Sequence, residues 1–514
     1  MIDALVLTEK GFIFLLLIAV LVAIAVKYIR LPYTIALVLC GAVIGVSGVE
    51  WIEGIELSEE LILFIFLPAL LFEGAIHMDF DKLKENSKVI LVLAVVGLTL
   101  GIFIVGYLLH YFTGIDFIYC LLFGAMIMPT DPVSVLALFK KLGVPKRLSM
   151  IVEGESLFND GTGIVIFGVI LGMINTHSKF DVSSTVITFL MVVLGGLLIG
   201  FITGYAVYRV LRKIDDHLIE VVLTGILAYG TFLVCESLHV SGVMGVVAAG
   251  LLIGNRGTVF AMSPTTRIAI QDSWELMAFI INSLIFLMIG IYISKWDILL
   301  HMDLIALAIA IVVITRAITV YPLIAVINLK VRNKIPASWM HVINLGGIHG
   351  SIPIALLLSL SEIPHLEELS FMVFGVVLFS LVVQGLSIEP LINWLRLSRT
   401  RPETARYMGL ITRKISTQQA LNELKAMRDN KEVPLQVYHK LRKEYEDGLS
   451  KLAGEIKKLI EEYPEIEKGQ TRYARKRMLL ARKSSIQHSI MKGITTGETA
   501  AELIQEIDAE LERE

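Results

Sequence analysis

The stretch Met128-Pro129-Thr130-Asp131-Pro132 lies inside a long apolar segment, and the stretch Glu155-Ser156-Leu157-Phe158-Asn159-Asp160-Gly161 lies inside the next one. A carboxylate in the middle of a segment of membrane-spanning length is costly, so it is a candidate functional group. Each of these two successive segments carries one, at Asp131 and at Asp160. We interpret the rest of the chain as scaffold, partner or appendage to this pair.

The composition indicates a membrane protein with many spans. Of the 514 residues, 55% are hydrophobic and 18% are charged, and the mean hydropathy is +0.74. Apolar runs of about 20 residues, each long enough to cross a hydrocarbon core of about 30 Å, follow one another up to about residue 395. The net charge of −3 gives no electrostatic reason to expect a nucleic-acid partner, and we predict none. The partner expected from this composition is the lipid bilayer.

The first span and the cysteines exclude some simpler interpretations. The first span, at about 11–29, follows acidic rather than basic residues and has no evident cleavage site, so we predict that it is retained. The three cysteines, Cys40, Cys120 and Cys235, lie in apolar runs without metal-ligand spacing. We interpret them as small buried hydrophobes and predict no cofactor.

The apolar pattern predicts about thirteen spans. They cover residues 11–29, 33–48, 58–76, 88–110, 117–139, 150–174, 184–211, 218–238, 241–254, 272–294, 302–327, 339–360 and 370–395. Basic residues fall on every second loop, for example Lys140 and Lys141 after the fifth span. The positive-inside rule therefore places the basic loops and the C-terminus in the cytoplasm and the N-terminus outside. The other loops hold Glu50, Glu53, Glu56, Asp116, Asp181, Glu362, Glu367 and Glu368.

Two of the predicted spans are interrupted. In the fifth, Pro129 and Pro132 each remove a backbone donor, and Pro132 disfavours helix at Asp131. The twelfth contains the stretch Asn344-Leu345-Gly346-Gly347-Ile348-His349-Gly350-Ser351-Ile352-Pro353. Interrupted segments in corresponding places of two halves point to a transport site built on inverted repeats. The unpaired backbone groups at such breaks can hold an ion where they line a cavity.

The helical phase of the sixth span gathers oxygen ligands. Ser156 and Asp160 are four residues apart and share one face, and Glu155 and Asn159 share the adjacent face. Their hydroxyl, carboxylate and amide oxygens, together with backbone carbonyls near Thr130, could coordinate a monovalent cation. A proton and a cation would then compete for Asp160, which is the minimum requirement for exchange. Because Asn159 is uncharged, we expect one proton per cation and electroneutral exchange.

Further polar residues in the spans need a role. Arg316 is the only Arg well inside an apolar span, and we pair it with Glu155 as a structural ion pair. Glu73, near the cytoplasmic end of the third span, is either a ligand or gate, or an interfacial carboxylate. His349 could sense pH, donate a hydrogen bond or be structural. Asp131 could ligate a cation directly, act through water or cap a half-helix.

Other classes of protein fit these residues less well. Polar residues can simply hold membrane helices together, but two unneutralised acids beside a broken helix are poorly suited to stabilise helix packing. A cation channel would need a continuous polar path, and no filter repeat is visible. An intramembrane protease would need contact between Asp131 and Asp160, and Ser156 lacks the second glycine of a nucleophile elbow. We therefore predict that the protein is not an enzyme.

The chain divides by composition into an apolar part, 1–397, and a polar tail, 398–514. The tail is rich in Glu and Lys and favours helices. Two interpretations of it stay open: solvated helices beneath the membrane, or a regulatory or dimer-contacting element. A basic cluster in the tail could rest on anionic lipid; it comprises Arg472, Arg475, Lys476, Arg477, Arg482 and Lys483.

The stretches Pro129-Thr130-Asp131-Pro132, Glu155-Ser156-Leu157-Phe158-Asn159-Asp160-Gly161 and Phe72-Glu73-Gly74 together resemble the cation:proton antiporter-1 family of NhaP-type Na⁺/H⁺ antiporters and their eukaryotic relatives. The resemblance covers roughly residues 11–397. It implies an all-α homodimer in the cell membrane, each protomer having a dimerisation domain and a mobile core with two crossed, interrupted helices. It also implies that Na⁺ or Li⁺ is exchanged for H⁺ by an elevator-like movement; K⁺/H⁺ exchange is a close variant.

The resemblance also implies roles for single residues. Asp160 matches the residue that binds ion and proton, and its pairing with Asn159 is typical of electroneutral members of the family. Na⁺ is expected at Asp160 together with Ser156, Thr130 and Glu73, with Asp131 nearby and Glu155–Arg316 as the buried ion pair. The family's twelfth span often reads Gly-Gly-Leu-Arg-Gly, whereas this chain has His349 at the basic position. The positive charge there becomes conditional on pH.

Overall fold

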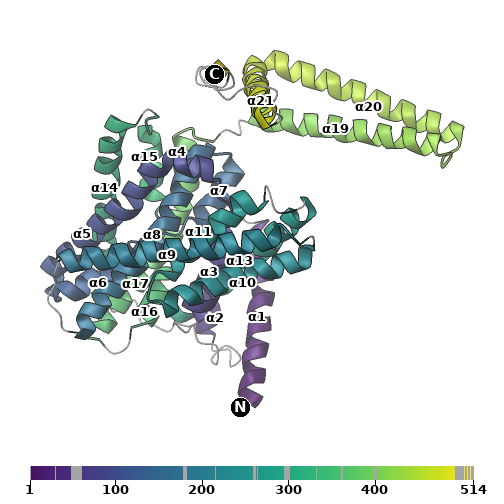
Figure 1. The fold of residues 1–514 in the computed structure, drawn as a ribbon. Coiled ribbons are helices and arrows are strands. Elements are labelled where there is room, and N and C mark those ends of the chain that lie inside the picture. The colour runs from purple at the N-terminus through teal and green to yellow at the C-terminus, as the bar shows by residue number, and fades with distance from the viewer. Residues whose placement is uncertain are drawn as a thin grey trace. The chain divides into compact units, whose positions relative to one another are not determined.

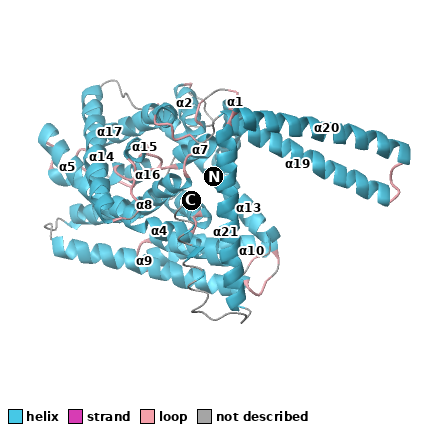
Figure 2. Ribbon diagram, turned by 90° about the horizontal axis from the view of Figure 1, so that it is seen from above, coloured by secondary structure: helices cyan, strands magenta, loops and turns pink. Residues whose placement is uncertain are grey.

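The computed structural model describes residues 2–28, 31–47, 61–176, 182–214, 216–258, 262, 264–294, 301–331, 333–360, 363–398, 402–491, 503, 506–507 and 510. Within this described part the secondary structure is helical, and loops join the helices (Figure 2). The loop residues Glu50, Glu53, Glu56, Asp181 and Glu362 lie outside the described residues. The chain divides into two units, Met1–Leu397 and Ser398–Glu514.

The first unit is a bundle of helices (Figure 1). Its first half contains α1 (Ile2–Val26), α2 (Tyr33–Val46), the π-helical turn Leu61–Phe66 leading into α3 (Leu67–His77), α4 (Phe80–Leu91), the π-helical turn Val92–Gly97 leading into α5 (Leu98–Thr113), α6 (Phe117–Ile127), α7 (Val133–Leu142), α8 (Lys146–Thr176) and α9 (Val182–Leu211). Its second half contains α10 (His217–Ser237), α11 (Gly242–Leu252) with the π-helical turn Ile253–Gly257, α13 (Pro264–Ile293), α14 (Met302–Lys330), α15 (Ala337–Leu345), α16 (Ile352–Leu358), α17 (Leu366–Phe379), the π-helical turn Ser380–Gln384 and α18 (Gly385–Trp394).

Each predicted span overlaps a described helix. Seven helical runs in the described part are long and apolar enough to cross a membrane, and shorter apolar helices accompany them. The all-helical fold is thus confirmed, whereas the number of membrane crossings stays a prediction.

Helices extend beyond the apolar stretches that mark the spans. The sequence predicts a span from residue 88, but α4 begins at Phe80. Asp79 caps this helix, because its carboxylate accepts a hydrogen bond from the backbone N–H of Lys82 at 3.2 Å. The Lys82 ammonium also bonds to this carboxylate and holds the pKa of Asp79 below its ordinary value. Hydropathy marks the part of a helix that suits the bilayer, whereas capping decides where the helix begins.

The two predicted interruptions are confirmed, and they meet. Helix stops at the prolines of the fifth span, between α6 and α7, and at the glycines of the twelfth, between α15 and α16. The backbone N–H of Asp131 in the first break donates to the carbonyl of Ile348 in the second at 2.6 Å. Gly350 permits this approach, since a Cβ there would lie 2.1 Å from Oδ2 of Asp131.

Small residues also let α2 and α13 pack closely. A Cβ on Gly41 would lie 2.1 Å from the carbonyl oxygen of Leu287, and a Cβ on Gly290 would lie 2.1 Å from that of Val38. Close backbone packing of this kind stabilises helix pairs in a bilayer, where lipid is as apolar as the side chains. The position of α13 matters because this helix lines the central cavity of the unit.

The second unit contains α19 (Pro402–Asp429), α20 (Leu435–Glu462) and α21 (Pro464–Met491), so the mostly helical tail is confirmed over its described part. α19 and α20 form a hairpin (Figure 1). Near its turn, the guanidinium of Arg428 lies 4.9 Å from the ring centroid of Tyr438. A small apolar core comprises Leu410, Ile456, Leu459 and Ile466. The predicted basic cluster falls on α21.

Candidate functional site

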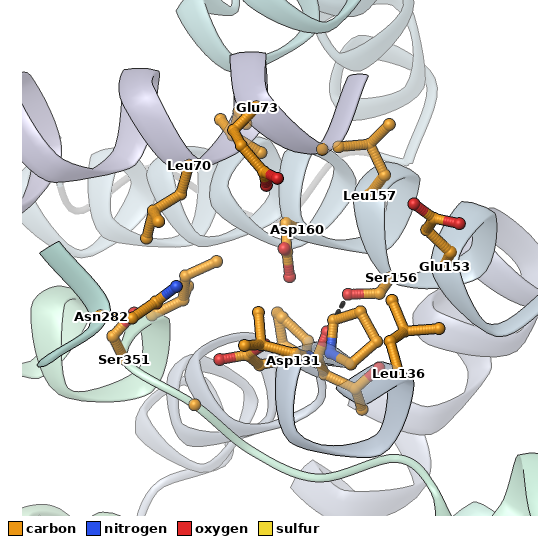
Figure 3. Close-up of a pocket in the computed structure, with 18 of the residues that line it drawn as sticks. Leu70, Glu73, Asp131, Leu136, Glu153, Ser156, Leu157, Asp160, Asn282 and Ser351 are labelled. Carbon is orange, nitrogen blue, oxygen red and sulfur yellow. Dashed lines mark hydrogen bonds between the residues drawn. The ribbon is translucent and has the colours of Figure 1, made fainter. Parts of the chain in front are cut away.

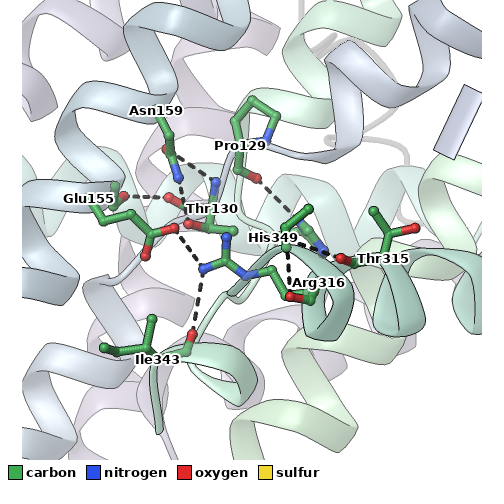
Figure 4. A network of polar contacts seen from close by, with 10 residues as sticks. Pro129, Thr130, Glu155, Asn159, Thr315, Arg316, Ile343 and His349 are labelled. Carbon is green, nitrogen blue, oxygen red and sulfur yellow. Dashed lines mark hydrogen bonds and ion pairs between the residues drawn. The ribbon is translucent and has the colours of Figure 1, made fainter. Parts of the chain in front are cut away.

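The polar face of α8 is hydrogen-bonded to Thr130 in the first break, between α6 and α7. The side-chain amide of Asn159 donates to Oγ1 of Thr130 at 2.9 Å, and the backbone N–H of Thr130 donates to Oδ1 of Asn159 at 3.4 Å (Figure 4). The Ser156 hydroxyl donates to the Thr130 carbonyl. All three residues are buried. Asn159 therefore positions Thr130, and it is not among the residues that line the adjacent cavity.

Asp160 is buried with one oxygen unpaired. The residue is 9% exposed, and its Oδ1 has no hydrogen-bond partner among the described residues. Since an unpartnered buried carboxylate is costly, this position is a strong candidate for binding a ligand. Asp160 points into a cavity of about 530 Å³ that Thr130, Asp131 and Ser156 also line (Figure 3). The structure thus brings these four predicted site residues to one place.

Asp131 both lines the cavity and supports the helix that follows it. Its Oδ1 accepts a hydrogen bond from the backbone N–H of Val133, the first residue of α7, at 2.9 Å. The carboxylate therefore satisfies an amide that the broken helix leaves free. Of the roles that the sequence left open, support of a half-helix is the one for which the structure provides a contact.

Glu155 and Arg316 form an ion pair behind the cavity. Nη2 of Arg316 lies 2.8 Å from Oε1 of Glu155, and the two residues are 9% and 2% exposed (Figure 4). The same Nη2 donates to the carbonyl of Ile343 at 3.5 Å. Gly347 leaves space for the guanidinium, since a Cβ there would lie 2.6 Å from Nε of Arg316.

His349 bridges the two breaks. It is 3% exposed, and its Nδ1 lies 3.1 Å from the carbonyl oxygen of Pro129 (Figure 4). A carbonyl can only accept, so Nδ1 carries the proton in this contact. The backbone N–H of His349 donates to Oγ of Ser380 at 2.9 Å. These contacts give His349 a structural role, and pH sensing by this residue stays a prediction.

Glu73 enters the cavity from a second helix. It belongs to α3, and Figure 3 shows its carboxylate directed toward the cavity that contains Asp160. Oε1 of Glu73 lies 3.3 Å from Nδ1 of His77, one turn further along α3, and both side chains are about one-third exposed. Glu73 is thus a wall residue with a basic neighbour, in contrast to the unpartnered Asp160.

The cavity is also lined by polar residues that the sequence did not single out, among them Glu153 on α8 and Glu275 and Asn282 on α13. Glu153 shares α8 with Asp160, and Glu275 shares α13 with Asn282. Each pair is seven residues apart, which is two turns of a helix and therefore one face. This spacing could have identified Glu153 beside Asp160 from the sequence. Ser351 of the second break, His77 on α3 and Lys140 on α7 also line the cavity.

The donor atoms in the cavity suit a hard cation. Hydroxyl, carboxylate and backbone carbonyl oxygens are the ligands that such cations prefer. Among the described residues, no group of three or more His, Cys, Asp or Glu is placed to hold a metal ion. The arrangement around Asp160 can instead bind one small cation with the oxygens of Ser156 and Thr130, or a proton on the carboxylate alone.

Comparisons with known proteins agree with this geometry. Residues 13–394 match the family described as "Sodium/hydrogen exchanger, transmembrane". The chain is 36% identical over 514 residues to the Na⁺/H⁺ antiporter NhaG of Bacillus atrophaeus, covering 97% of each chain. It is 40% identical over 401 residues to the Na⁺/H⁺ antiporter ApNhaP of Aphanothece halophytica, covering 77% of this chain and 76% of that one.

A solved structure shares the fold. The sodium proton antiporter MjNhaP1 from Methanocaldococcus jannaschii matches with a TM-score of 0.63 at 20% identity, over 76% of this chain and 99% of that chain. At this identity the likeness establishes the arrangement of helices and no more.

Proposed function

Since the chain belongs to the transmembrane sodium/hydrogen exchanger family, we propose that it is a secondary active transporter that exchanges Na⁺ or Li⁺ for H⁺ across the cytoplasmic membrane. The observation that supports this most directly is the buried, unpartnered carboxylate of Asp160 in a cavity lined by further oxygen ligands. Relatives over most of the chain are named Na⁺/H⁺ antiporters.

Asp160 carries the exchange in this proposal. Na⁺ binds its carboxylate together with oxygens of Ser156 and Thr130, and with Glu73 from the opposite wall. A proton neutralises the same carboxylate, so the two ligands displace one another. Asn159 holds Thr130 in position without adding a charge.

The absence of a charge on Asn159 supports a one-for-one exchange. One Na⁺ replaces one H⁺ on a single carboxylate, and no net charge crosses the membrane. The membrane potential then does not act on the cycle, whereas each uncompensated charge would couple to it by about 2.3 kcal/mol per 100 mV. The Glu155 charge stays out of the cycle because Arg316 neutralises it.

Alternating access follows from the crossing of the two breaks. The cavity extends to His77, the last residue of α3, and to Lys140 in the last turn of α7, on the side where basic residues lie between the predicted spans. We assign this side to the cytoplasm, with the N-terminus outside. The crossed breaks move with the core of a homodimer, and the unit Ser398–Glu514 is a cytoplasmic, regulatory tail.

Reconstitution into proteoliposomes with an internal pH dye tests the proposal. Added Na⁺ should discharge an imposed proton gradient, and Asp160→Asn should abolish this response. Asp81→Asn, which removes an exposed carboxylate on α4, serves as the matched control and should behave as the unaltered protein. Na⁺-dependent proton flux that persists in Asp160→Asn would contradict the proposed role of Asp160. A membrane potential generated by exchange would contradict the one-for-one ratio, and a response to K⁺ alone would replace Na⁺ as the substrate.

A further inference from the structure

Acidic side chains line the cavity in two groups. The inner group is Asp160 with its electrostatic neighbour Asp131, and the Glu155–Arg316 ion pair lies behind the cavity. The outer group surrounds Glu153, whose electrostatic neighbours are Glu73 and His77. The proposed exchange uses Asp160 and Glu73 and gives Glu153 no role.

Distance separates Glu153 from Asp160. The two residues share one face of α8 but are seven positions apart, which places their Cα atoms about 10 Å apart along the helix axis. Neither carboxylate is among the electrostatic neighbours of the other, so the two carboxylates offer an ion two separate positions. An ion that reaches Asp160 through the cavity from the N-terminal end of α8 passes Glu153 first (Figure 3).

Glu153 is available to a passing ion. It is half-buried in the cavity wall, and the described residues provide it with no hydrogen-bond or ion-pair partner. The other charged groups that line the cavity are Glu73 and His77 on α3, Asp131 in the first break, Lys140 on α7, Asp160 on α8 and Glu275 on α13. Of the cationic groups, His77 is the one that pairs with an acid of the outer group, because it lies 3.3 Å from Glu73.

We propose that Glu153 is a relay residue that binds the cation on its way between the basic-loop side of the protein and Asp160. The inference rests on the proposed cation/proton exchange and adds a second cation-binding position to it. Glu153 attracts the incoming ion and passes it to Asp160, where the ion displaces the proton.

Sided transport measurements test the relay. Glu153→Gln should raise the Na⁺ concentration for half-maximal exchange roughly five- to tenfold, equivalent to about 1–1.4 kcal/mol, when Na⁺ is added on the basic-loop side of membrane vesicles. The maximal rate from that side should stay within about twofold. With Na⁺ on the opposite side, the half-maximal concentration should not change but the maximal rate should fall by the same factor, because the ratio of the two quantities must be equal in both directions of a passive one-for-one exchange at equal pH. Glu153→Asp should restore the original concentration. Glu85→Gln, an exposed position on α4, controls for the loss of one negative charge.

The outcomes separate the relay from the proposed function. If the unaltered protein exchanges Na⁺ for H⁺ but Glu153→Gln shifts both sides equally, lowers only the maximal rate or changes nothing, the relay is wrong and the exchange stands. If the unaltered protein shows no exchange, both proposals fail together.

Discussion

Removing Arg316 alone should destabilise the protein far more than removing the whole Glu155–Arg316 pair. The two charged groups are 2.8 Å apart, and both residues are at most 9% exposed. Removal of one partner from a buried pair typically costs about 3–5 kcal/mol, because the remaining charge stays buried without compensation. Arg316→Met keeps a long side chain but leaves the Glu155 carboxylate alone, so we expect a loss of stability in that range.

The double variant Glu155→Gln/Arg316→Met should be much less costly. Both charges are absent from it, and replacing a buried ion pair by neutral side chains of similar volume is often close to neutral. We expect a total loss below about 2 kcal/mol, although each single variant loses more than that. The second substitution would thus restore stability that the first one removed.

Thermal unfolding in detergent, followed by fluorescence-detected size exclusion, can compare the unaltered protein, both single variants and the double variant. The double-variant cycle gives the coupling energy of the pair directly. If the losses of the two single variants add up to the loss of the double variant within about 0.5 kcal/mol, the pair is not coupled and the reasoning is refuted.

Two further predictions concern the backbone. Gly350→Ala should cost about 1–3 kcal/mol and slow exchange in the proteoliposome assay, because the new Cβ would lie 2.1 Å from Asp131 Oδ2, whereas Gly168→Ala, with no heavy atom within 4 Å, should do neither. Asp79→Ala should lower the stability by about 1 kcal/mol through loss of the α4 cap. Because Lys82 lowers the pKa of Asp79, this contribution is present at neutral pH and disappears as the pH falls through the lowered pKa; thermal melts that show an equal loss at every pH would contradict it.

The breaks and the buried pair could be predicted because each depends on one strong local signal. Proline at Pro129 and Pro132 cannot continue a regular helix, whatever surrounds it. Arg316 is the only Arg well inside an apolar span, so a buried acid such as Glu155 was its natural partner. The phase of α8 was equally local, and it placed Ser156 and Asp160 on the cavity side.

The rest of the site depends on contacts between distant helices. The sequence does not show that His349 meets the carbonyl of Pro129, or that α13 brings Glu275 to the same cavity as α8. It also presents Asn159 as a ligand, whereas both ends of its amide bond to Thr130 in the structure. Glu153, in contrast, could have been identified from the sequence, because it lies seven residues before Asp160 and therefore on the same face of the helix.

Coupling between cation and proton depends on what the neighbours of Asp160 already bind. Glu155 is neutralised by Arg316, the Asn159 amide is bonded to Thr130, and Asp131 accepts from the start of α7. Asp160 is the member of this group with a buried oxygen that has neither a hydrogen-bond nor an ion-pair partner among the described residues. A second free acid beside it would let a cation bind without displacing the proton. The proposed one-for-one exchange therefore follows from the bonds that occupy the surrounding residues as much as from the single carboxylate that they leave open.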